Sequence, residues 1–264
     1  MLNDKTVVIT GAGGGLGRAY AVAAGAAGAN VVVNDVNLTA ARAVAEELTA
    51  SGSQAIAVGG SVSSWEDSEA LVDECTRRFG QIDGLVTNAG IKHEAHPWDE
   101  TEENLRSIAE VNILGVQFIA RHAMRAMVDQ GVGGSIVNIV SGAQFGIRGM
   151  SAYGASKGAV TAMTANWAKE AELHHIRVNA ISPLAMTPMA AQDTRDDVPD
   201  LPDPNTVAPL VVALLSDEAV GITGHTIRFD GRSMSRYTAP EITDSSMRSE
   251  GWSAEELVRH ISGW

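Results

Sequence analysis

The chain has 264 residues, 45% of them hydrophobic and 19% charged, a composition typical of a globular protein and unlike that of a disordered or collagen-like chain. Its formal net charge of −13 disfavours binding to nucleic acid or to an anionic membrane surface. The chain has one cysteine, so no internal disulfide can form, and no apolar segment has the length of a membrane span. We therefore expect a cytoplasmic protein.

Short, continuously apolar runs alternate with longer segments whose hydrophobic residues recur at helical spacing. Such runs are typical of strands buried on both faces, and they lie at 7–9, 31–33, 55–58, 82–86, 136–140, 176–181 and 226–229. Helical patterns lie between them, for example at 15–27, 38–48 and 151–173. The alternation predicts the α/β class, with a Rossmann-type doubly wound parallel sheet of about seven strands flanked by helices. We expect a single dinucleotide-binding domain over residues 1–264.

Two segments interrupt this alternation. Residues 184–204 are rich in proline and aspartate, which favours a polar substrate loop or lid over a metal site, and we expect no metal. Residues 232–264 follow the last predicted strand as a C-terminal extension, in which a capping box at 253–256 opens a short helix to about Ile261. Five apolar residues would give this tail something to bury: Trp252, Leu257, Val258, Ile261 and Trp264.

A glycine-rich segment, Thr10-Gly11-Ala12-Gly13-Gly14-Gly15-Leu16-Gly17, joins the first predicted strand to the first predicted helix. Glycines permit a tight turn and a close approach of backbone N–H groups to a pyrophosphate, and the helix N-terminus adds unpaired donors. The alternative is a glycine-rich turn without a ligand, but the position between strand and helix favours a dinucleotide. The candidate cofactor-binding residues here are Gly11, Gly13, Gly14, Gly15, Leu16 and Gly17.

Asp35 ends the second predicted strand, eighteen residues after Gly17. A carboxylate at this position can accept hydrogen bonds from the adenosine ribose hydroxyls of NAD. It would also face the 2′-phosphate of NADP, and two unit charges about 4 Å apart repel by roughly 4 kcal/mol at an effective dielectric of about 20. The residue before Gly15 is Gly14, so no cation stands there to offset the repulsion. The sequence therefore predicts NAD as the cofactor.

Tyr153 and Lys157 lie four residues apart, which places them on one face of the predicted helix. A phenol has a pKa of about 10, so lowering it toward 7 requires about 4 kcal/mol of preferential stabilisation of the phenolate. A nearby ammonium and the positive nicotinamide ring of NAD⁺ can each contribute. Tyr153 can then exchange a proton with an alcohol while a hydride moves to or from the cofactor.

Seven motifs give the pair its significance, and through them the chain resembles the short-chain dehydrogenase/reductase family over about residues 4–231. They are TGAGGGLG at 10–17, TNAG at 87–90, VN at 111–112, NIVS at 138–141, YGASK at 153–157, IRVNAISP at 176–183 and ITG at 222–224. The resemblance implies that Tyr153, Ser141, Lys157 and Asn112 are catalytic. Ser141 would bond the reacting oxygen, Lys157 would also bind the nicotinamide ribose, and Asn112 would hold a water in a proton relay.

The resemblance also implies further contacts. Along the cofactor it places Asn88, Ala89, Gly90, Pro183 and Thr187, with Ser61 and Val62 near the adenine and Tyr153 and Lys157 near the nicotinamide. It also implies that the substrate contacts Ser141, Gln144, Tyr153 and Met186. The chain departs from the family where Thr87 replaces an asparagine, Ser61 an aspartate and Leu184 a glycine. Ser141 also precedes Tyr153 by twelve residues, one fewer than is usual, a difference that the predicted loop at 142–150 can absorb.

These expectations define an NAD-dependent oxidoreductase that interconverts a secondary alcohol and a ketone. The substrate is expected to be hydrophobic, such as a hydroxyacyl thioester, a hydroxysteroid or a similar alcohol. The alternatives are a non-catalytic NAD-binding sensor or scaffold, and an epimerase or dehydratase that retains its cofactor. The family resemblance further implies a homotetramer, with a dimer as the other option, in which the helix of Tyr153 lies in a four-helix interface.

Overall fold

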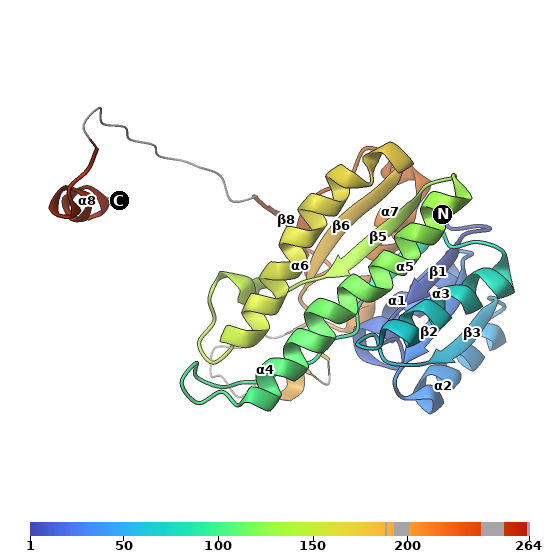
Figure 1. Cartoon of the computed structure of the whole chain (residues 1–264). Coiled ribbons are helices and arrows are strands. Elements are labelled where there is room, and N and C mark those ends of the chain that lie inside the picture. The colour runs from blue at the N-terminus through green and yellow to red at the C-terminus, as the bar shows by residue number, and fades with distance from the viewer. Residues whose placement is uncertain (188, 193–200, 239–250, 263–264) are drawn as a thin grey trace.

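The computed structural model describes residues 1–187, 189–192, 201–238 and 251–262, and its centre is one eight-stranded sheet (Figure 1). The strand order is β3-β2-β1-β4-β5-β6-β7-β8, in which the first seven strands are parallel and β8 is antiparallel to β7. The strands are β1 (Thr6–Ile9), β2 (Asn30–Asp35), β3 (Ala55–Gly59), β4 (Gly84–Thr87), β5 (Gly134–Ile139), β6 (Ile176–Pro183), β7 (Thr226–Phe229) and β8 (Met234–Tyr237).

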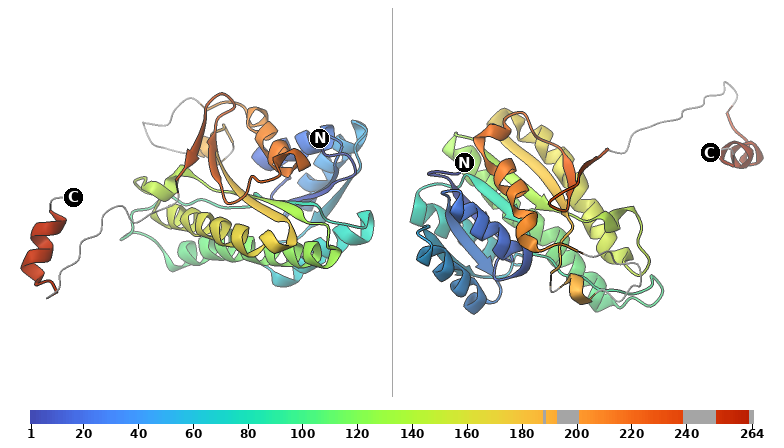
Figure 2. Two further views of the ribbon diagram at one scale, coloured as in Figure 1. Left: turned by 90° about the horizontal axis from the view of Figure 1, so that it is seen from above. Right: turned by 180° about the vertical axis from the view of Figure 1, so that it is seen from behind.

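Helices cover both faces of the sheet, as the alternating pattern predicts (Figures 1 and 2). One face carries α1 (Gly15–Ala26), α2 (Leu38–Ala50) and α7 (Ala208–Leu215), and the other carries α3 (Trp65–Phe79), α5 (Gly115–Gln130) and α6 (Ser151–Glu170). Helix α4 (Glu102–Ile108) leads through a π-helical turn (Ala109–Leu114) into α5. The short 3-10 turns lie at Gly142–Phe145, Glu172–His174, Ala190–Gln192, Pro204–Thr206 and Asp217–Ala219.

Burial on both faces explains why the strands are continuously apolar. In β1, Val7 and Ile9 pack with α1 and α7, whereas Val8, which points to the opposite face, packs with α3 and α5. All three side chains are essentially inaccessible to solvent. The doubly wound fold and its helical layers are thus confirmed, and the carboxyl ends of the parallel strands meet at one edge, where ligands bind in such sheets.

The end of the chain differs from the prediction in one respect. Residues 232–264 do not simply follow the last strand, because residues 234–237 form β8 along the edge of β7. A search for apolar runs misses this strand because its sequence, Met-Ser-Arg-Tyr, is largely exposed and is held by backbone pairing. The sheet therefore has eight strands instead of about seven.

The capping box at Ser253 and Glu256 is present and opens α8 (Ala254–Ile261), as predicted. Three of its apolar residues, Leu257, Val258 and Ile261, are 40%, 65% and 51% exposed, so the helix does not bury them against the described part of the chain. In both figures α8 stands apart from the sheet and its helices. Trp264 and the aspartates at 193, 196, 197 and 200 lie outside the described residues. Within those residues, no helix combines the length and apolarity that crossing a bilayer demands.

Candidate active site

The glycine-rich turn lies between β1 and α1 at the carboxyl edge of the sheet. Gly11 and Gly15 have φ values of +61° and +52°, a region that glycine adopts without strain. A Cβ atom on Gly11 would lie 2.8 Å from the Ala89 Cα, so the turn packs directly on the chain that follows β4. Among the described residues no side chain caps the N-terminus of α1, and its first turn contains no acidic residue. These free N–H groups and the positive end of the helix dipole form a site suited to a pyrophosphate.

Asn88 ties this turn to the end of β4. Its Nδ2 donates to the carbonyl oxygens of Thr10 and Gly11 at 2.9 and 3.0 Å. The Thr10 hydroxyl in turn accepts hydrogen bonds from the backbone N–H groups of Asn88 and Ala89, both at 3.1 Å. The side chain of Asn88 therefore fixes the shape of the turn from a neighbouring strand, which is a structural basis for its predicted place beside the cofactor.

Asp35 stands at the end of β2, next to the same turn. Its Oδ2 accepts a hydrogen bond from the Gly13 N–H at 3.0 Å, and its Oδ1 accepts one from the Asn37 N–H at 2.9 Å. The nearest cation that follows the turn, Arg18, is paired with Glu47 on α2. Asp35 therefore brings a negative charge to the glycine-rich turn, where an adenosine ribose would lie.

Two glycines of the turn provide a matched test of its packing. A Cβ atom on Gly17 would overlap the Gly11 carbonyl oxygen and lie 2.6 Å from Asn88 Nδ2, whereas no atom of the described residues lies within 4 Å of one on Gly14. Gly14 has an extended backbone that any residue adopts. We expect Gly17→Ala to lower the free energy of unfolding by about 2 kcal/mol or more and to weaken cofactor binding. Gly14→Ala should change stability by less than about 0.5 kcal/mol.

Thermal unfolding and NADH titration of the two variants test this expectation. Equal stability of Gly17→Ala and Gly14→Ala would contradict the close packing of the turn on Asn88.

Ser141 and Tyr153 meet at the start of α6. The Ser141 side chain acts to lower the pKa of the Tyr153 phenol, but burial outweighs this effect and the pKa is raised overall. Ser141 Oγ also accepts a hydrogen bond from the Ala143 N–H at 3.2 Å, which begins the 3-10 turn at 142–145. In the protein alone, Tyr153 is therefore a neutral phenol at neutral pH, and an added positive charge is needed to ionise it.

Lys157 is buried one helical turn after Tyr153. Its Nζ donates to the Ile139 carbonyl oxygen at 2.8 Å and lies 5.6 Å from the centre of the Tyr153 ring. Burial lowers the pKa of this ammonium from 10.5 to about 8. The position that a Cβ atom would take on Gly90 is 3.6 Å from Lys157 Nζ and 3.3 Å from Asn112 Oδ1, so only a residue without a side chain leaves the space between them open.

The lowered pKa of Lys157 predicts a pH dependence of folding. Below pH 8 the ammonium is charged in both states, and the folded state carries the full cost of its burial. Between the folded pKa of about 8 and the unfolded value of 10.5 only the unfolded chain keeps the proton, so stability rises with pH. Relative to Lys157→Met, the wild type should gain about 2 kcal/mol between pH 7 and pH 10.

Denaturant unfolding of both proteins without cofactor, at constant ionic strength, measures this difference. A difference that stays constant over the whole pH range would contradict the burial of a titrating ammonium.

Asn112 lies in the π-helical turn between α4 and α5 and is completely buried. Its Oδ1 accepts from the Ile91 N–H at 2.9 Å, and its Nδ2 donates to the Ile91 carbonyl oxygen at 2.8 Å and to Ser156 Oγ at 3.1 Å. Ser156 Oγ donates to the Tyr153 carbonyl oxygen at 2.7 Å. A π-turn is uncommon and is found often at functional sites. Here it directs an asparagine toward both the chain after β4 and the helix of Tyr153.

The remaining predicted residues make contacts within their own segments of the chain. Gln144 is in the 3-10 turn after Ser141, and its Nε2 is buried without a hydrogen-bond partner among the described residues. Thr187 Oγ1 accepts from the Ala190 N–H at 3.0 Å, and the Met186 N–H donates to the Pro202 carbonyl oxygen at 2.7 Å. Pro183 ends β6.

Two residues in the loop after β3 were predicted to lie near the adenine. The Ser61 hydroxyl is hydrogen-bonded to that of Ser63 at 2.8 Å, and the Ser61 N–H donates to Asp67 at 2.9 Å. Val62 is buried and packs against Gly115 at the start of α5. Ser61 thus already has hydrogen-bond partners in the loop and in the first turn of α3.

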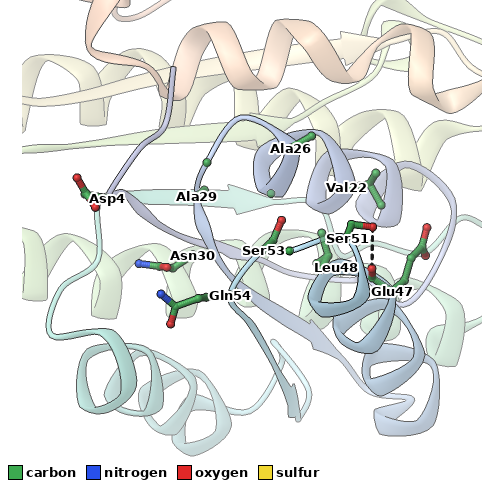
Figure 3. A pocket seen from close by; sticks show the side chains of 13 residues that line it. Asp4, Val22, Ala26, Ala29, Asn30, Glu47, Leu48, Ser51, Ser53 and Gln54 are labelled. Atoms are coloured by element: carbon green, nitrogen blue, oxygen red, sulfur yellow. Dashed lines mark hydrogen bonds between the residues drawn. The ribbon is translucent and has the colours of Figure 1, made fainter.

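A cavity of about 400 Å³ lies away from this centre, at the amino edge of the sheet (Figure 3). Asp4, Asn30 and Gln54, which line it, precede or begin β1, β2 and β3. The figure shows the Ser51 hydroxyl hydrogen-bonded to the Glu47 carbonyl oxygen at 3.0 Å on its rim. None of the predicted catalytic residues lines this cavity, so it is separate from the candidate active site. Among the described residues, no group of three or more His, Cys, Asp or Glu could hold a metal ion.

The chain is similar to known proteins over most of its length. Residues 5–198 match the family described as short chain dehydrogenase. A cyclohexanol dehydrogenase of Acinetobacter sp. (strain SE19) is 35% identical over 87% of this chain and 94% of its own length. A short chain dehydrogenase from Mycobacterium avium has a crystal structure that matches with a TM-score of 0.91 and 33% identity, covering 99% of this chain and 94% of that one.

A 3-ketoacyl-(acyl-carrier-protein) reductase from Brucella melitensis, solved in complex with NADH, matches with a TM-score of 0.83 and 31% identity. The match covers 88% of this chain and 99% of that one. The chain therefore belongs to the short-chain dehydrogenase/reductase family. It is an oxidoreductase of that family, and the family binds a nicotinamide cofactor.

Sequence reasoning did not identify several residues that hold the site together. Thr10 and Ser156 supply hydroxyls that bridge the glycine turn to β4 and Asn112 to Tyr153, and Ile91 satisfies Asn112 through its backbone. The position of Ser156 three residues after Tyr153, on the same helix face, is the signal that could have identified it. Arg228 and Tyr237, which approach the loop after Ser141, lie too far along the chain for any spacing to reveal them.

Proposed function

We propose that the protein is an NAD-dependent dehydrogenase/reductase that interconverts a secondary alcohol and its ketone, with Tyr153 as the general acid/base. The observation that carries this proposal is the convergence of Ser141, Tyr153 and Lys157. The Ser141 side chain is close enough to Tyr153 to act on the pKa of its phenol, and a buried ammonium lies 5.6 Å from the centre of the phenol ring.

Charge balance explains how the phenol becomes a base. Burial keeps Tyr153 neutral in the protein alone, while Lys157 has a pKa of about 8 and is charged at neutral pH. When bound, oxidised NAD supplies the hydride acceptor and a further positive charge. Both charges favour the phenolate, which removes the proton of the alcohol. Ser141 donates a hydrogen bond to the reacting oxygen and so orients the substrate.

The proton must then leave the buried centre. Lys157 and Asn112 lie on either side of Gly90, where the missing side chain leaves room for a water between Lys157 Nζ and Asn112 Oδ1. The proposed route for the proton runs from Tyr153 past Lys157, which would also hold the cofactor ribose, to a water held at Asn112. Because Asn112 is fixed by Ile91 and Ser156, it can position such a water without moving.

The cofactor is proposed to be NAD, held by the glycine turn and Asp35. Asn88, Ala89 and Gly90 would line it, Pro183 and Thr187 would lie at the nicotinamide end, and Ser61 and Val62 would lie at the adenine end. Asp35 supports NAD over NADP because the residues that follow it, Val36 and Asn37, bring no positive charge.

The substrate is proposed to be a hydrophobic secondary alcohol that contacts Ser141, Gln144, Tyr153 and Met186. The unpartnered Nε2 of Gln144 can donate a hydrogen bond to it. Cyclohexanol, the substrate named for one relative, is a small member of this class. A hydroxyacyl thioester is a larger member, and the name of the Brucella reductase points in that direction.

A spectrophotometric screen tests the proposal. Purified protein is mixed with NAD⁺ or NADP⁺ and with cyclic alcohols, hydroxysteroids or 3-hydroxyacyl thioesters, and the absorbance of the reduced cofactor is followed. Reduction of NAD⁺ that depends on the alcohol supports the proposal and excludes a sensor, scaffold, epimerase or dehydratase. NADH binding without turnover of any alcohol or ketone would favour the sensor or scaffold instead.

Self-association is proposed to occur through α5 and α6. A groove of about 550 Å³ runs between these helices and is lined by Arg121, Met124, Val128 and Trp167 among others. Because the groove is lined by both apolar and cationic side chains, contact with a second copy of the chain is more favourable than exposure to water. Light scattering after gel filtration should give the mass of a tetramer or dimer. Met124→Glu places a charge in the groove and should lower the measured mass.

A further inference from the structure

Strands β7 and β8 bring a cationic side chain to the loop that carries Ser141. In the sheet Arg228 lies opposite Ser182 of β6 on one side and Ser235 of β8 on the other, while Tyr237 lies opposite Thr226. Since directly opposed residues, and residues two apart in one strand, point to the same face of a sheet, Arg228, Tyr237 and Ser182 share one face.

This face lies against the residue that follows Ser141. A Cβ atom on Gly142 would lie 3.1 Å from Arg228 Nη1 and 3.5 Å from the Tyr237 hydroxyl. The Tyr237 hydroxyl donates to Ser182 Oγ at 3.1 Å, and its ring packs edge-on against Phe145 at 4.8 Å between ring centres. Tyr237 is therefore held from two sides, and it fixes the space into which the guanidinium reaches.

Arg228 has no hydrogen-bond or ion-pair partner within the described residues, although it is half-buried. The nearest acid along its strand, Asp230, accepts hydrogen bonds from the N–H groups of Arg232 and Ser233 within its own turn. Arg177, an arginine of the neighbouring strand, donates to the carbonyl oxygens of Leu214 and Ser216 at 2.7 and 2.9 Å. A half-buried guanidinium with unused donors beside a reactive centre is a candidate recognition group for an anion.

We propose that Arg228 binds a carboxylate of the substrate, with Tyr237 holding the guanidinium in place. The planar fork of a guanidinium matches the two oxygens of a carboxylate. The substrate would then be a hydroxy acid whose carboxylate lies a few bonds from the carbinol carbon, because Gly142 is the immediate neighbour of Ser141. A chain with a net charge of −13 repels anions at long range, so it needs such a local cation to accept one. This inference rests on the proposed function.

Substrate pairs that differ in one charge test the inference. The values of kcat/KM are measured with NAD⁺ for 3- and 4-hydroxycyclohexanecarboxylate and for their methyl esters. The wild type should prefer the acids. Arg228→Met should lower kcat/KM for the acids about 10- to 100-fold, mainly through KM, and should change the esters less than about 3-fold. Arg228→Lys, which keeps the charge but not the fork, should lie between the two.

Arg236→Met is the matched control, because Arg236 is an exposed residue of the same hairpin that lies opposite Ile227 and points to the other face. Arg236→Met should leave kcat/KM unchanged for both the acids and the esters. Tyr237→Phe removes the bond to Ser182 and should raise KM for the acids only, which a general loss of structure would not do. Equal losses on acids and esters in Arg228→Met, or a wild type without preference for the acids, would overturn the inference.

A binding measurement separates this inference from the proposed function. Cyclohexanecarboxylate has no carbinol to oxidise, so its binding to the NADH complex can be measured by calorimetry without any turnover. Binding that is lost in Arg228→Met and kept in Arg236→Met supports the carboxylate site. Turnover of neutral alcohols without any binding of cyclohexanecarboxylate would contradict the site and leave the proposed function standing. Binding of cyclohexanecarboxylate without turnover of any alcohol would contradict the proposed function.

Discussion

Tyr153→Phe is expected to lower kcat for alcohol oxidation and ketone reduction by a factor of about 100 to 10,000, while NADH still binds. General acid/base catalysis by a positioned side chain contributes an effect of this size, and the variant loses only the hydroxyl that exchanges the proton. The ring keeps its place at the start of α6. Steady-state kinetics in both directions give kcat, and NADH fluorescence titration gives the affinity for the cofactor.

The chain offers a chemically identical control at a second tyrosine. Tyr20 on α1 is completely buried, and its hydroxyl has no hydrogen-bond partner among the described residues. Tyr20→Phe therefore removes an unsatisfied polar atom, and it should leave kcat unchanged and stability equal or higher. If Tyr153→Phe turned over within a few-fold of the wild type, the assignment of Tyr153 would be wrong. Equal losses in both variants would indicate a folding defect instead of a catalytic one.

Asp35→Asn is expected to shift cofactor preference toward NADP⁺ by up to about 1,000-fold in the ratio of kcat/KM values. The substitution keeps the shape of the side chain and removes the charge that would face a 2′-phosphate. The corresponding repulsion is roughly 4 kcal/mol at about 4 Å and an effective dielectric of about 20. Because Asp35 is partly exposed, salt screens this effect, so the shift should shrink as ionic strength rises.

Glu46→Gln controls for the loss of one negative charge on the neighbouring helix. Glu46 is an exposed residue of α2 in the helix that follows Asp35. Its loss should change the ratio of kcat/KM values less than about 3-fold, since exposed charges interact weakly through solvent. A wild type that already prefers NADP⁺, or the same shift in both variants, would contradict the role of Asp35.

The sequence was sufficient to predict the parallel part of the sheet, because burial on both faces demands continuously apolar strands. Val7, Val8 and Ile9 illustrate this, since each packs into a hydrophobic core on one side or the other. Strand β8 could not be predicted in this way, because it covers an edge and is held by backbone hydrogen bonds while most of its side chains stay in solvent.

The candidate site was predictable where its residues share a helix or a motif, and not where the fold alone joins them. Tyr153 and Lys157 are neighbours on α6, so their spacing was informative. The hydrogen bonds of Asn112 to Ile91 and Ser156 join three segments that are distant in the sequence, so these bonds are seen only in the folded structure. The pKa of Tyr153 is raised, whereas a lowered pKa was expected. The reason is that burial affects the phenol in the protein alone, whereas the positive charge of the cofactor contributes only when the cofactor is bound.

Strand β8 has a consequence for any shortened version of the chain. Removing residues from Met234 onward would leave the backbone N–H and C=O groups of β7 unpaired along an open edge, which invites pairing with strands of other molecules. The same deletion would remove Tyr237. Aggregation and altered substrate recognition would then occur together, so single substitutions within the hairpin are the only way to separate the two.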